Sequence, residues 1–214
     1  MKKLDIIYED KNILVINKPA KLLTIADNKE RVNTLYHEVR EYLHKKNQKV
    51  FIVHRLDKDT SGIILFCKNE KIKRLLQDNW NSYYREYIAV VEGHLKNKKG
   101  TIKCYLNETK TNQVYVANNK EGKLAITEYE VINYNKTNSL VKIVIKTGRK
   151  NQIRATMSFL GNPIIGDKKY NSKQNIFNRL ALHHTKLEII NPINKKVLTF
   201  YSEPPKIFFT GFNK

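Results

Sequence analysis

The sequence predicts an α+β fold built on a central mixed, largely antiparallel sheet with flanking helices. Short apolar runs recur along the 214 residues, whereas stretches with helical spacing are few. Many of the runs are separated by short polar turns, which is typical of hairpins. Strands and helices also fail to alternate strictly, as they would in a parallel βαβ fold. Because no repeat or low-complexity linker is evident, a single domain over 1–214 is the simplest division.

The expected strands are short. Two lie within 6–17 around a turn at 9–12, and Pro19 ends the second because proline lacks a backbone N–H. A hairpin is expected over 113–132, turning at 121–123. The other expected strands are 51–53, 63–66, 87–91, 140–145 and 197–201.

Three segments, 33–45, 70–80 and 151–160, have the apolar spacing of a helix. Asn33 and Asn69 stand at the start of the first two as candidate N-caps. The residues expected to face inward on the second and third helices are Ile72, Leu75, Leu76, Ile153, Met157 and Leu160.

Charge is the strongest signal in the composition. Forty Lys and Arg residues against twenty Asp and Glu leave a formal net charge of +20. A positive surface favours a polyanion such as RNA, because each neutralised phosphate releases condensed counterions. The composition alone also fits a solvated lysine-rich surface, so it indicates a partner and no chemistry.

The cysteine content and the N-terminal segment exclude several classes of protein. The two cysteines, Cys67 and Cys104, cannot form a zinc cage, and Cys67 lies in an apolar run where a buried thiol is expected. Acidic residues interrupt the N-terminal segment, and no run approaches the roughly 20 apolar residues of a membrane span. We therefore expect a soluble, cytoplasmic protein, not bound to a membrane and monomeric.

The loop 54–62, His-Arg-Leu-Asp-Lys-Asp-Thr-Ser-Gly, places ionisable groups between two apolar strands. Arg55 and Lys58 flank Asp57, and nearby positive charge favours an ionised carboxylate that can act as nucleophile or base. The residues alone fit a polar turn equally well, with Gly62 supplying an unusual dihedral. A calcium loop is excluded, because the twelfth position holds Lys68 where a bidentate Glu is required.

The same loop resembles the H-R-L-D-x-x-T-S-G signature of RluA-type RNA pseudouridine synthases. Further matches follow in the family's order and cover nearly the whole chain. They are 84–93 (K-x-Y-x-A-x-V-x-G, with arginine for the usual lysine), 147–154 (T-G-R-x-H-Q-I-R), 161–167 (G-x-P-I-x-G-D) and 179–183 (R-L-A-L-H).

The resemblance implies a catalytic role for three residues. Asp57 corresponds to the essential carboxylate that acts at the ribose of the target uridine. Tyr87 corresponds to the tyrosine that stacks on the base, and Arg154 to the arginine that ion-pairs the aspartate. Arg55 corresponds to the residue that fills the stack when the uridine flips out. Without the resemblance, Tyr87 would fit a strand core and Arg154 a phosphate contact.

Contacts to RNA are expected from His54, Arg55, Arg149 and Asn151. This chain departs from the pattern at Asn151 and Met157, where the family has histidines, which affects RNA fit more than chemistry. Many relatives carry an S4 RNA-binding domain before the catalytic one, and we expect none here. His183 and His184 lack metal-site partners, so a structural hydrogen bond is expected there.

The resemblance implies an isomerase that converts uridine in RNA to pseudouridine with neither metal nor organic cofactor. The expected fold is one pseudouridine-synthase-like catalytic domain with a basic cleft, and the expected substrate is 23S ribosomal RNA before transfer RNA. Two other classes stay open. One is an inactive RNA-binding homologue that assists ribosomal or transfer RNA maturation. The other is a glycosidic hydrolase, although no second carboxylate with a comparable motif is evident.

Overall fold

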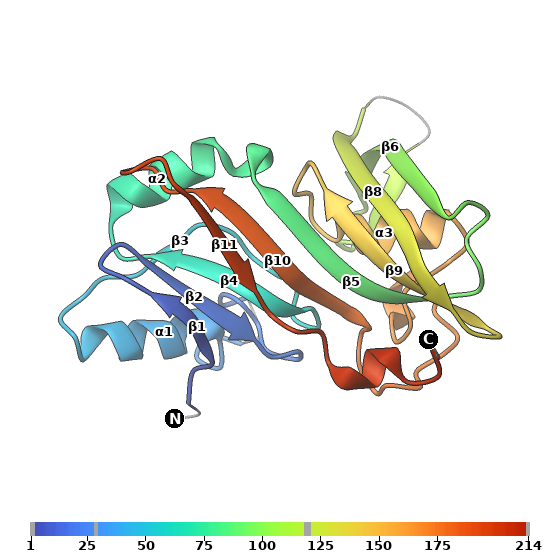
Figure 1. Ribbon diagram of the computed structural model, residues 1–214, viewed down its shortest axis with the longest axis horizontal. Helices are drawn as coiled ribbons and strands as arrows, with labels where there is room; N and C mark the ends of the chain where they lie inside the picture. The colour runs from blue at the N-terminus through green and yellow to red at the C-terminus, as the bar shows by residue number, and fades with distance from the viewer. Residues whose placement is uncertain (1–2, 28–29, 118–120, 213–214) are drawn as a thin grey trace. The chain divides into compact units, whose positions relative to one another are not determined.

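The structure is a computed structural model that describes residues 3–27, 30–117 and 121–212. The chain divides into two compact units: Met1–Tyr83 with His184–Glu203, and Tyr84–His183 with Pro204–Lys214. Both units combine antiparallel strands with short helices (Figure 1), so the α+β prediction is confirmed. A single domain over the whole chain and a basic cleft stay predictions.

The first unit holds a sheet in the order β1, β2, β4, β10, in which β2 pairs antiparallel with both β1 and β4. β3 also pairs with β4, and β11 pairs with β10. The bounds are β1 Ile6–Glu9, β2 Ile13–Lys18, β3 Phe51–Ile52, β4 Ser61–Cys67, β10 Leu182–Ile190 and β11 Val197–Tyr201. The expected strands are confirmed, but β10 was missed.

Both faces of β2 and β4 are buried, which explains their continuous apolar runs. Helix α1 (Leu35–His44) covers one face and α2 (Glu70–Asp78) the other, as Figure 1 shows. Alternate strand residues therefore belong to two different clusters. Beside α1 lie Leu14, Ile16, Ile64 and Phe66, and beside α2 lie Ile13, Val15, Ile63 and Leu65.

The helix starts were predicted with mixed success. Asn69 caps α2 as expected, because its side chain accepts a hydrogen bond from the backbone N–H of Lys71. The cap of α1 is Thr34 and not Asn33, since the Thr34 hydroxyl accepts from the backbone N–H of His37 at 3.2 Å.

The prediction that Leu75 of α2 faces inward is wrong, because its side chain is 37% exposed. The predicted helix over 70–80 ends earlier, and a 3₁₀ turn follows at Trp80–Ser82.

The second unit holds a sheet in the order β5, β9, β8, β6, β7. The bounds are β5 Tyr84–Glu92, β6 Lys99–Glu108, β7 Val114–Ala117, β8 Lys123–Tyr134 and β9 Asn138–Ile145. The predicted hairpin over 113–132 is wrong, because β7 and β8 each pair with β6, a strand that was not predicted. Residues 118–120 of the predicted hairpin lie outside the described residues.

Helix α3 (Gln152–Phe159) packs on this sheet through Ala155, which clusters with side chains of β6, β7 and β8. Ile153 and Met157 are buried as predicted, whereas Leu160 is 37% exposed because the helix ends at Phe159. Two further 3₁₀ turns are Lys168–Tyr170 and Lys206–Phe209. Among the described residues no helix has the length and apolar character needed to span a membrane.

We expect Gly62→Ala to lower the free energy of unfolding by about 3 kcal/mol. Gly62 has φ +110°, and a Cβ there would lie 2.3 Å from the backbone oxygen of His184. Gly161→Ala is the matched control, since Gly161 also has a positive φ but nothing lies within 4 Å. It should cost about 1 kcal/mol. Equal losses in denaturant titrations of the two variants would contradict the close approach.

We also expect acid destabilisation through Glu9. Its carboxylate accepts hydrogen bonds from Lys68 at 2.6 Å, Tyr42 at 2.7 Å and Lys46 at 3.0 Å. Desolvation opposes these bonds, yet together they lower the pKa of Glu9 to about 2. A lowered folded-state pKa stabilises above the unfolded pKa, and that stability is lost as pH falls.

Unfolding free energy should therefore drop between about pH 5 and pH 2, with a shallower slope in Glu9→Gln. Glu41→Gln, which removes an exposed carboxylate paired with Arg40, serves as the control and should leave the slope unchanged. Identical slopes for Glu9→Gln and the parent protein would contradict the prediction.

Candidate active site

The loop that carries Asp57 connects β3 to β4 in the first unit, and its backbone is fixed by Thr24. The Thr24 hydroxyl donates to the carbonyl of Leu56 at 2.8 Å and accepts from the N–H of Leu56 at 3.2 Å. Thr24 and Leu56 are both buried, and Asp57 next to them is half-buried. The residue before Asp57 is therefore held at both of its backbone polar groups.

The residue after Asp57 is held by a buried ammonium group. Lys18, at the end of β2, is fully buried, and its Nζ donates to the carbonyls of Lys58 at 3.0 Å, Pro19 at 2.9 Å and Leu22 at 2.7 Å. Removing an ammonium from water is costly unless its protons are bound, and these carbonyls bind them. Lys18 thus joins the end of β2 to the Asp57 loop.

The two ends of the loop are also tied down. The N–H of Thr60 donates to the carbonyl of Asp57 at 3.2 Å, which closes a tight turn. At the other end, Nε2 of His54 accepts from the N–H of Leu65 at 3.0 Å, and the ring stacks on Trp80 at 4.3 Å. These contacts give His54 a structural task, whereas Arg55 is exposed. An RNA contact at either residue stays a prediction.

Tyr87 and Arg85 lie on β5 in the second unit. Tyr87 is 7% exposed and Arg85 only 1%. Nη2 of Arg85 donates to the carbonyl of Lys146 at 3.1 Å, and a side chain on Gly148 would crowd Nη1. Burial lowers the pKa of Arg85, against the opposing effect of nearby Tyr87. The arginine in place of the family's lysine is therefore accommodated beside a glycine.

Gln152 organises the loop that precedes α3. Its Oε1 accepts from the hydroxyl of Thr147 at 2.8 Å and from the N–H of Arg149 at 3.0 Å. Its Nε2 donates to the carbonyl of Ile126 at 3.1 Å and to the hydroxyl of Thr127 at 2.9 Å. Gln152 is buried and all four of its hydrogen-bonding positions are used, so it fixes the loop on β8.

Arg154 and Asp167 form a bidentate ion pair. Nε and Nη2 of Arg154 donate to the two carboxylate oxygens of Asp167 at 2.7 and 2.8 Å. The side chains are 11% and 1% exposed. The guanidinium lies 5.0 Å from the ring centre of Tyr170. Paired, planar contacts of this kind fix both the position and the direction of an arginine.

Asn151 completes this cluster. Its Oδ1 accepts from Nη1 of Arg154 at 3.3 Å, and its Nδ2 donates to the hydroxyl of Tyr170 at 3.1 Å. Asn151 has φ 49° and ψ 22°, a left-handed conformation that asparagine tolerates better than most residues. It is 8% exposed, so its side chain serves the cluster, and an RNA contact at Asn151 stays a prediction.

The predicted site residues are divided between the two units. Arg154 and Asn151 lie together in the second unit, and Tyr87 belongs to the same unit, whereas Asp57 belongs to the first. The grouping of Asp57, Tyr87 and Arg154 into one site stays a prediction. Arg149 is exposed, and its Nε donates to the carbonyl of Leu124 at 3.0 Å.

Four residues that support the predicted site residues were given no role in the sequence analysis: Lys18, Thr24, Gln152 and Asp167. Gln152 and Asp167 stand inside recognised motifs, so their motif positions were a usable signal. Lys18 is the last residue of the apolar strand β2, a position at which a lysine ordinarily extends into water. Thr24 lies in an irregular segment with no pattern that marks it.

His184 has the structural role that was expected. It is fully buried, and its Nδ1 donates to the carbonyl of Ile63 at 2.6 Å. No group of three His, Cys, Asp or Glu side chains suited to a metal occurs among residues 3–27, 30–117 and 121–212. Cys67 is buried as predicted, and burial raises the pKa of its thiol to about 12.

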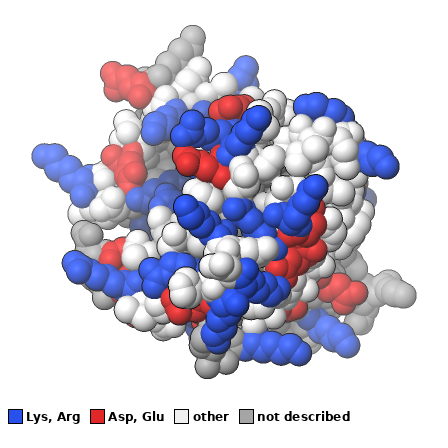
Figure 2. Space-filling model, turned by 90° about the vertical axis from the view of Figure 1, so that its left-hand side faces the viewer, with Lys and Arg blue, Asp and Glu red and all other residues white. Residues whose placement is uncertain are grey.

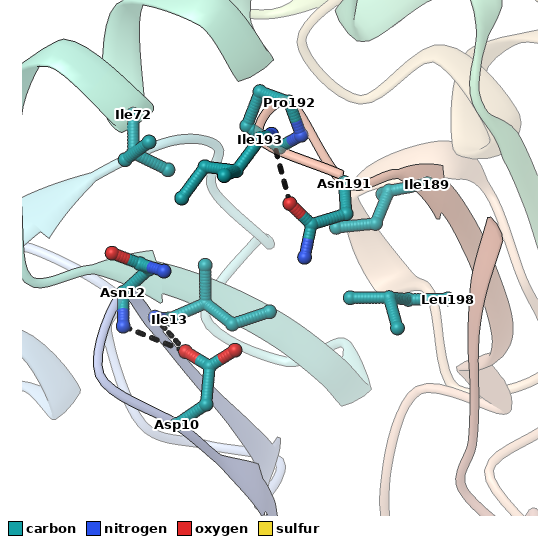
Figure 3. Close-up of a pocket in the computed structure, with 9 residues that line it drawn as sticks. All are labelled: Asp10, Asn12, Ile13, Ile72, Ile189, Asn191, Pro192, Ile193 and Leu198. Carbon is teal, nitrogen blue, oxygen red and sulfur yellow. Dashed lines mark hydrogen bonds between the residues drawn. The ribbon is translucent and has the colours of Figure 1, made fainter. Parts of the chain in front are cut away.

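Figure 3 shows a pocket elsewhere in the first unit, and none of the predicted site residues lines it. Its lining includes the apolar side chains of Ile13, Ile72, Ile189 and Leu198. Oδ1 of Asp10 accepts from the N–H groups of Asn12 at 2.6 Å and Ile13 at 2.8 Å, so this carboxylate closes the turn between β1 and β2.

On the face drawn in Figure 2, Lys and Arg side chains outnumber Asp and Glu, in keeping with the net charge of +20.

Comparison with known proteins gives consistent results. The RNA pseudouridylate synthase family matches residues 12–159. The protein YhcT of Bacillus subtilis, an uncharacterized RNA pseudouridine synthase, is 34% identical over 202 residues, which are 92% of this chain and 67% of the relative. The ribosomal large subunit pseudouridine synthase D of Borreliella burgdorferi is 35% identical over 98% of this chain and 68% of the relative.

Solved structures share the fold. Human RNA pseudouridylate synthase domain containing 4 superposes with a TM-score of 0.78 at 23% identity, over 95% of this chain and 89% of that one. Human RNA pseudouridylate synthase domain containing 1 gives 0.79 at 22% identity, over 95% and 84%. The sequence relatives place the chain among the enzymes that isomerise a nucleotide within RNA. It belongs to the RNA pseudouridine synthase family.

We expect Gln152→Leu to lower the free energy of unfolding by about 3 kcal/mol, because the change leaves several buried polar groups without their partner. Gln113→Leu is the matched control. Gln113 is exposed, and its Nε2 donates only to the carbonyl of Lys169 at 3.3 Å. That variant should change stability by less than about 0.5 kcal/mol in thermal unfolding. Similar melting temperatures for the two variants would contradict the role of Gln152.

Proposed function

We propose that this chain isomerises a uridine in RNA with Asp57 as the catalytic carboxylate, assisted by Tyr87 and Arg154. The observation that carries the proposal is the Asp57 loop. Its sequence matches the family signature, and Thr24 and Lys18 hold the backbone on either side of Asp57. A rigid support of this kind is what a reacting group requires.

In the proposed reaction the uridine leaves the RNA stack and enters the site. The N1–C1′ bond breaks, the uracil turns, and a C5–C1′ bond forms, while the proton at C5 is lost and one is gained at N1. Asp57 acts at the ribose C1′ or C2′. Tyr87 offers a ring face for stacking and a hydroxyl for proton transfer at C5. Arg154 orients the Asp57 carboxylate through paired hydrogen bonds.

Binding of RNA is proposed to involve Arg55 and Arg149, which are both exposed. Arg55 would fill the gap that a flipped base leaves in a stacked strand. The net charge of +20 supports a polyanionic substrate. His54 and Asn151 are proposed to contact RNA as well, in addition to the contacts that the His54 ring and the Asn151 amide make within the protein.

The substrate is proposed to be large-subunit ribosomal RNA, with transfer RNA as the second candidate. The similarity to the ribosomal large subunit pseudouridine synthase D of Borreliella burgdorferi favours the first. The chain spans about two thirds of that relative's length, so the substrate of the relative does not by itself identify the substrate of this protein. An experiment on RNA is therefore required. Mapping pseudouridine in total RNA, with and without this protein, identifies the modified molecule and position.

Asp57→Asn should abolish pseudouridine formation, because the amide cannot act as nucleophile or base, while RNA affinity stays within about threefold of the parent protein. Product is measured by carbodiimide adducts, and RNA binding by filter retention. Asp78→Asn, at the end of α2, is the control that removes an exposed carboxylate from the same unit.

The same assay separates the competing functions. An isomerase gives adducts, a hydrolase gives free uracil, and an RNA-binding homologue gives neither. Turnover retained in Asp57→Asn would refute the assignment of Asp57.

A further inference from the structure

We infer that Asp167 is a positioning residue for the reaction: it locks the guanidinium of Arg154 so that only one edge can bind a second carboxylate. The inference rests on the proposed role of Arg154 as the partner of Asp57. It assigns a task to the last residue of the 161–167 motif, which the proposed mechanism does not otherwise use.

The geometry of a guanidinium explains why one ion pair determines the next. An arginine can bind a carboxylate with two parallel hydrogen bonds through the edge formed by Nε and Nη2 or through the edge formed by Nη1 and Nη2. Asp167 occupies the first edge, at 2.7 and 2.8 Å. A second carboxylate that makes two hydrogen bonds must then approach through the other edge.

The remaining contacts limit rotation of the guanidinium. The Asn151 amide oxygen accepts from Nη1 at 3.3 Å, and the ring of Tyr170 lies against one face at 5.0 Å. The hydroxyl of Tyr170 in turn accepts from Asn151. The guanidinium of Arg154 is thus contacted by Asp167 along the edge of Nε and Nη2, by Asn151 at Nη1, and by Tyr170 across one face. The asparagine that replaces the family's histidine takes part in this arrangement.

Asp167 can act as a fixed anchor because its own backbone is held. Its carbonyl accepts from the N–H groups of Tyr170 and Ser172, both at 3.0 Å. Gly166 before it has φ +82°, and a Cβ there would lie 2.1 Å from the carbonyl oxygen of Arg179. The side chain of Asp167 is 1% exposed, so water does not compete for its oxygens.

The ion pair also sets how Arg154 can help Asp57. Asp167 balances the charge of Arg154, so the pair as a whole is close to neutral. What Arg154 then offers a second carboxylate is mainly the direction of its N–H groups. Loss of Asp167 should therefore harm the chemical step more than the binding of RNA.

The test compares the steady-state kinetics of Asp167→Asn, Arg154→Lys and the double variant on a substrate RNA. Asp167→Asn should lower kcat roughly 30-fold, since small misplacements cost about two orders of magnitude, with KM within about threefold. Arg154→Lys should lower kcat at least as much, because lysine cannot make the two-edged contact. In the Arg154→Lys background, Asp167→Asn should cost less than about threefold, because residues that act as a unit are non-additive.

Thermal unfolding is measured for each variant, and rates are compared at a temperature where all are folded. If Asp167→Asn does not fold, Asp167→Glu replaces it; this variant keeps the charge and shifts the carboxylate, and the same loss in kcat is expected. Glu130→Gln is the control. It removes a carboxylate of the second unit that pairs with Lys99 and Lys142 and should leave kcat unchanged.

Each outcome has a distinct meaning. Full kcat in Asp167→Asn together with a loss in Arg154→Lys overturns the positioning role and leaves the proposed function intact. An equal further loss in the double variant also overturns it, because Asp167 would then act independently. Full kcat in Arg154→Lys instead refutes the proposed role of Arg154.

Discussion

The buried ammonium of Lys18 is the constraint on which the Asp57 loop depends. An ammonium that is fully removed from water must place its protons on acceptors, and in this chain carbonyls of Pro19, Leu22 and Lys58 converge on it. The direction of the backbone after Asp57 is therefore coupled to the end of β2 and to the segment that follows it. Thr24, which binds the backbone of Leu56, lies in that same segment. The end of β2 and the segment after it therefore hold the backbone on both sides of Asp57.

The parts of the fold that the sequence predicted are those with local or fully buried patterns. β2 and β4 were found because both of their faces are covered, which leaves uninterrupted apolar runs. β6 was missed although Ile102, Cys104 and Leu106 alternate with Lys103 and Tyr105, a spacing that is typical of a half-buried strand. The hairpin between β7 and β8 was wrong because the local turn does not decide pairing. β6, the strand immediately before β7 in the chain, lies between β7 and β8 and pairs with both.

For the site, the motifs identified residue types but not all of their partners. Arg154 was predicted to pair with Asp57, and that pair stays a prediction. The structure shows a pair of Arg154 with Asp167, thirteen positions later in the chain. Nothing in the spacing reveals this contact, because the glycine-containing loop before Asp167 brings the carboxylate back to α3. Lys18 was unpredictable for a related reason. A lysine at a strand end ordinarily extends into water, and only the converging carbonyls explain its burial.

The Arg154–Asp167 pair also bears on the choice between isomerase and hydrolase. A glycosidic hydrolase needs a second carboxylic acid that delivers a proton to the leaving group. Asp167 is a buried carboxylate of the second unit, yet both of its oxygens are directed at N–H groups of one guanidinium. A carboxylate so engaged suits the anchoring of an arginine better than the delivery of a proton to a leaving group. The engagement of Asp167 by Arg154 therefore supports isomerisation, in which the uracil is retained, over hydrolysis, in which it must be protonated and released.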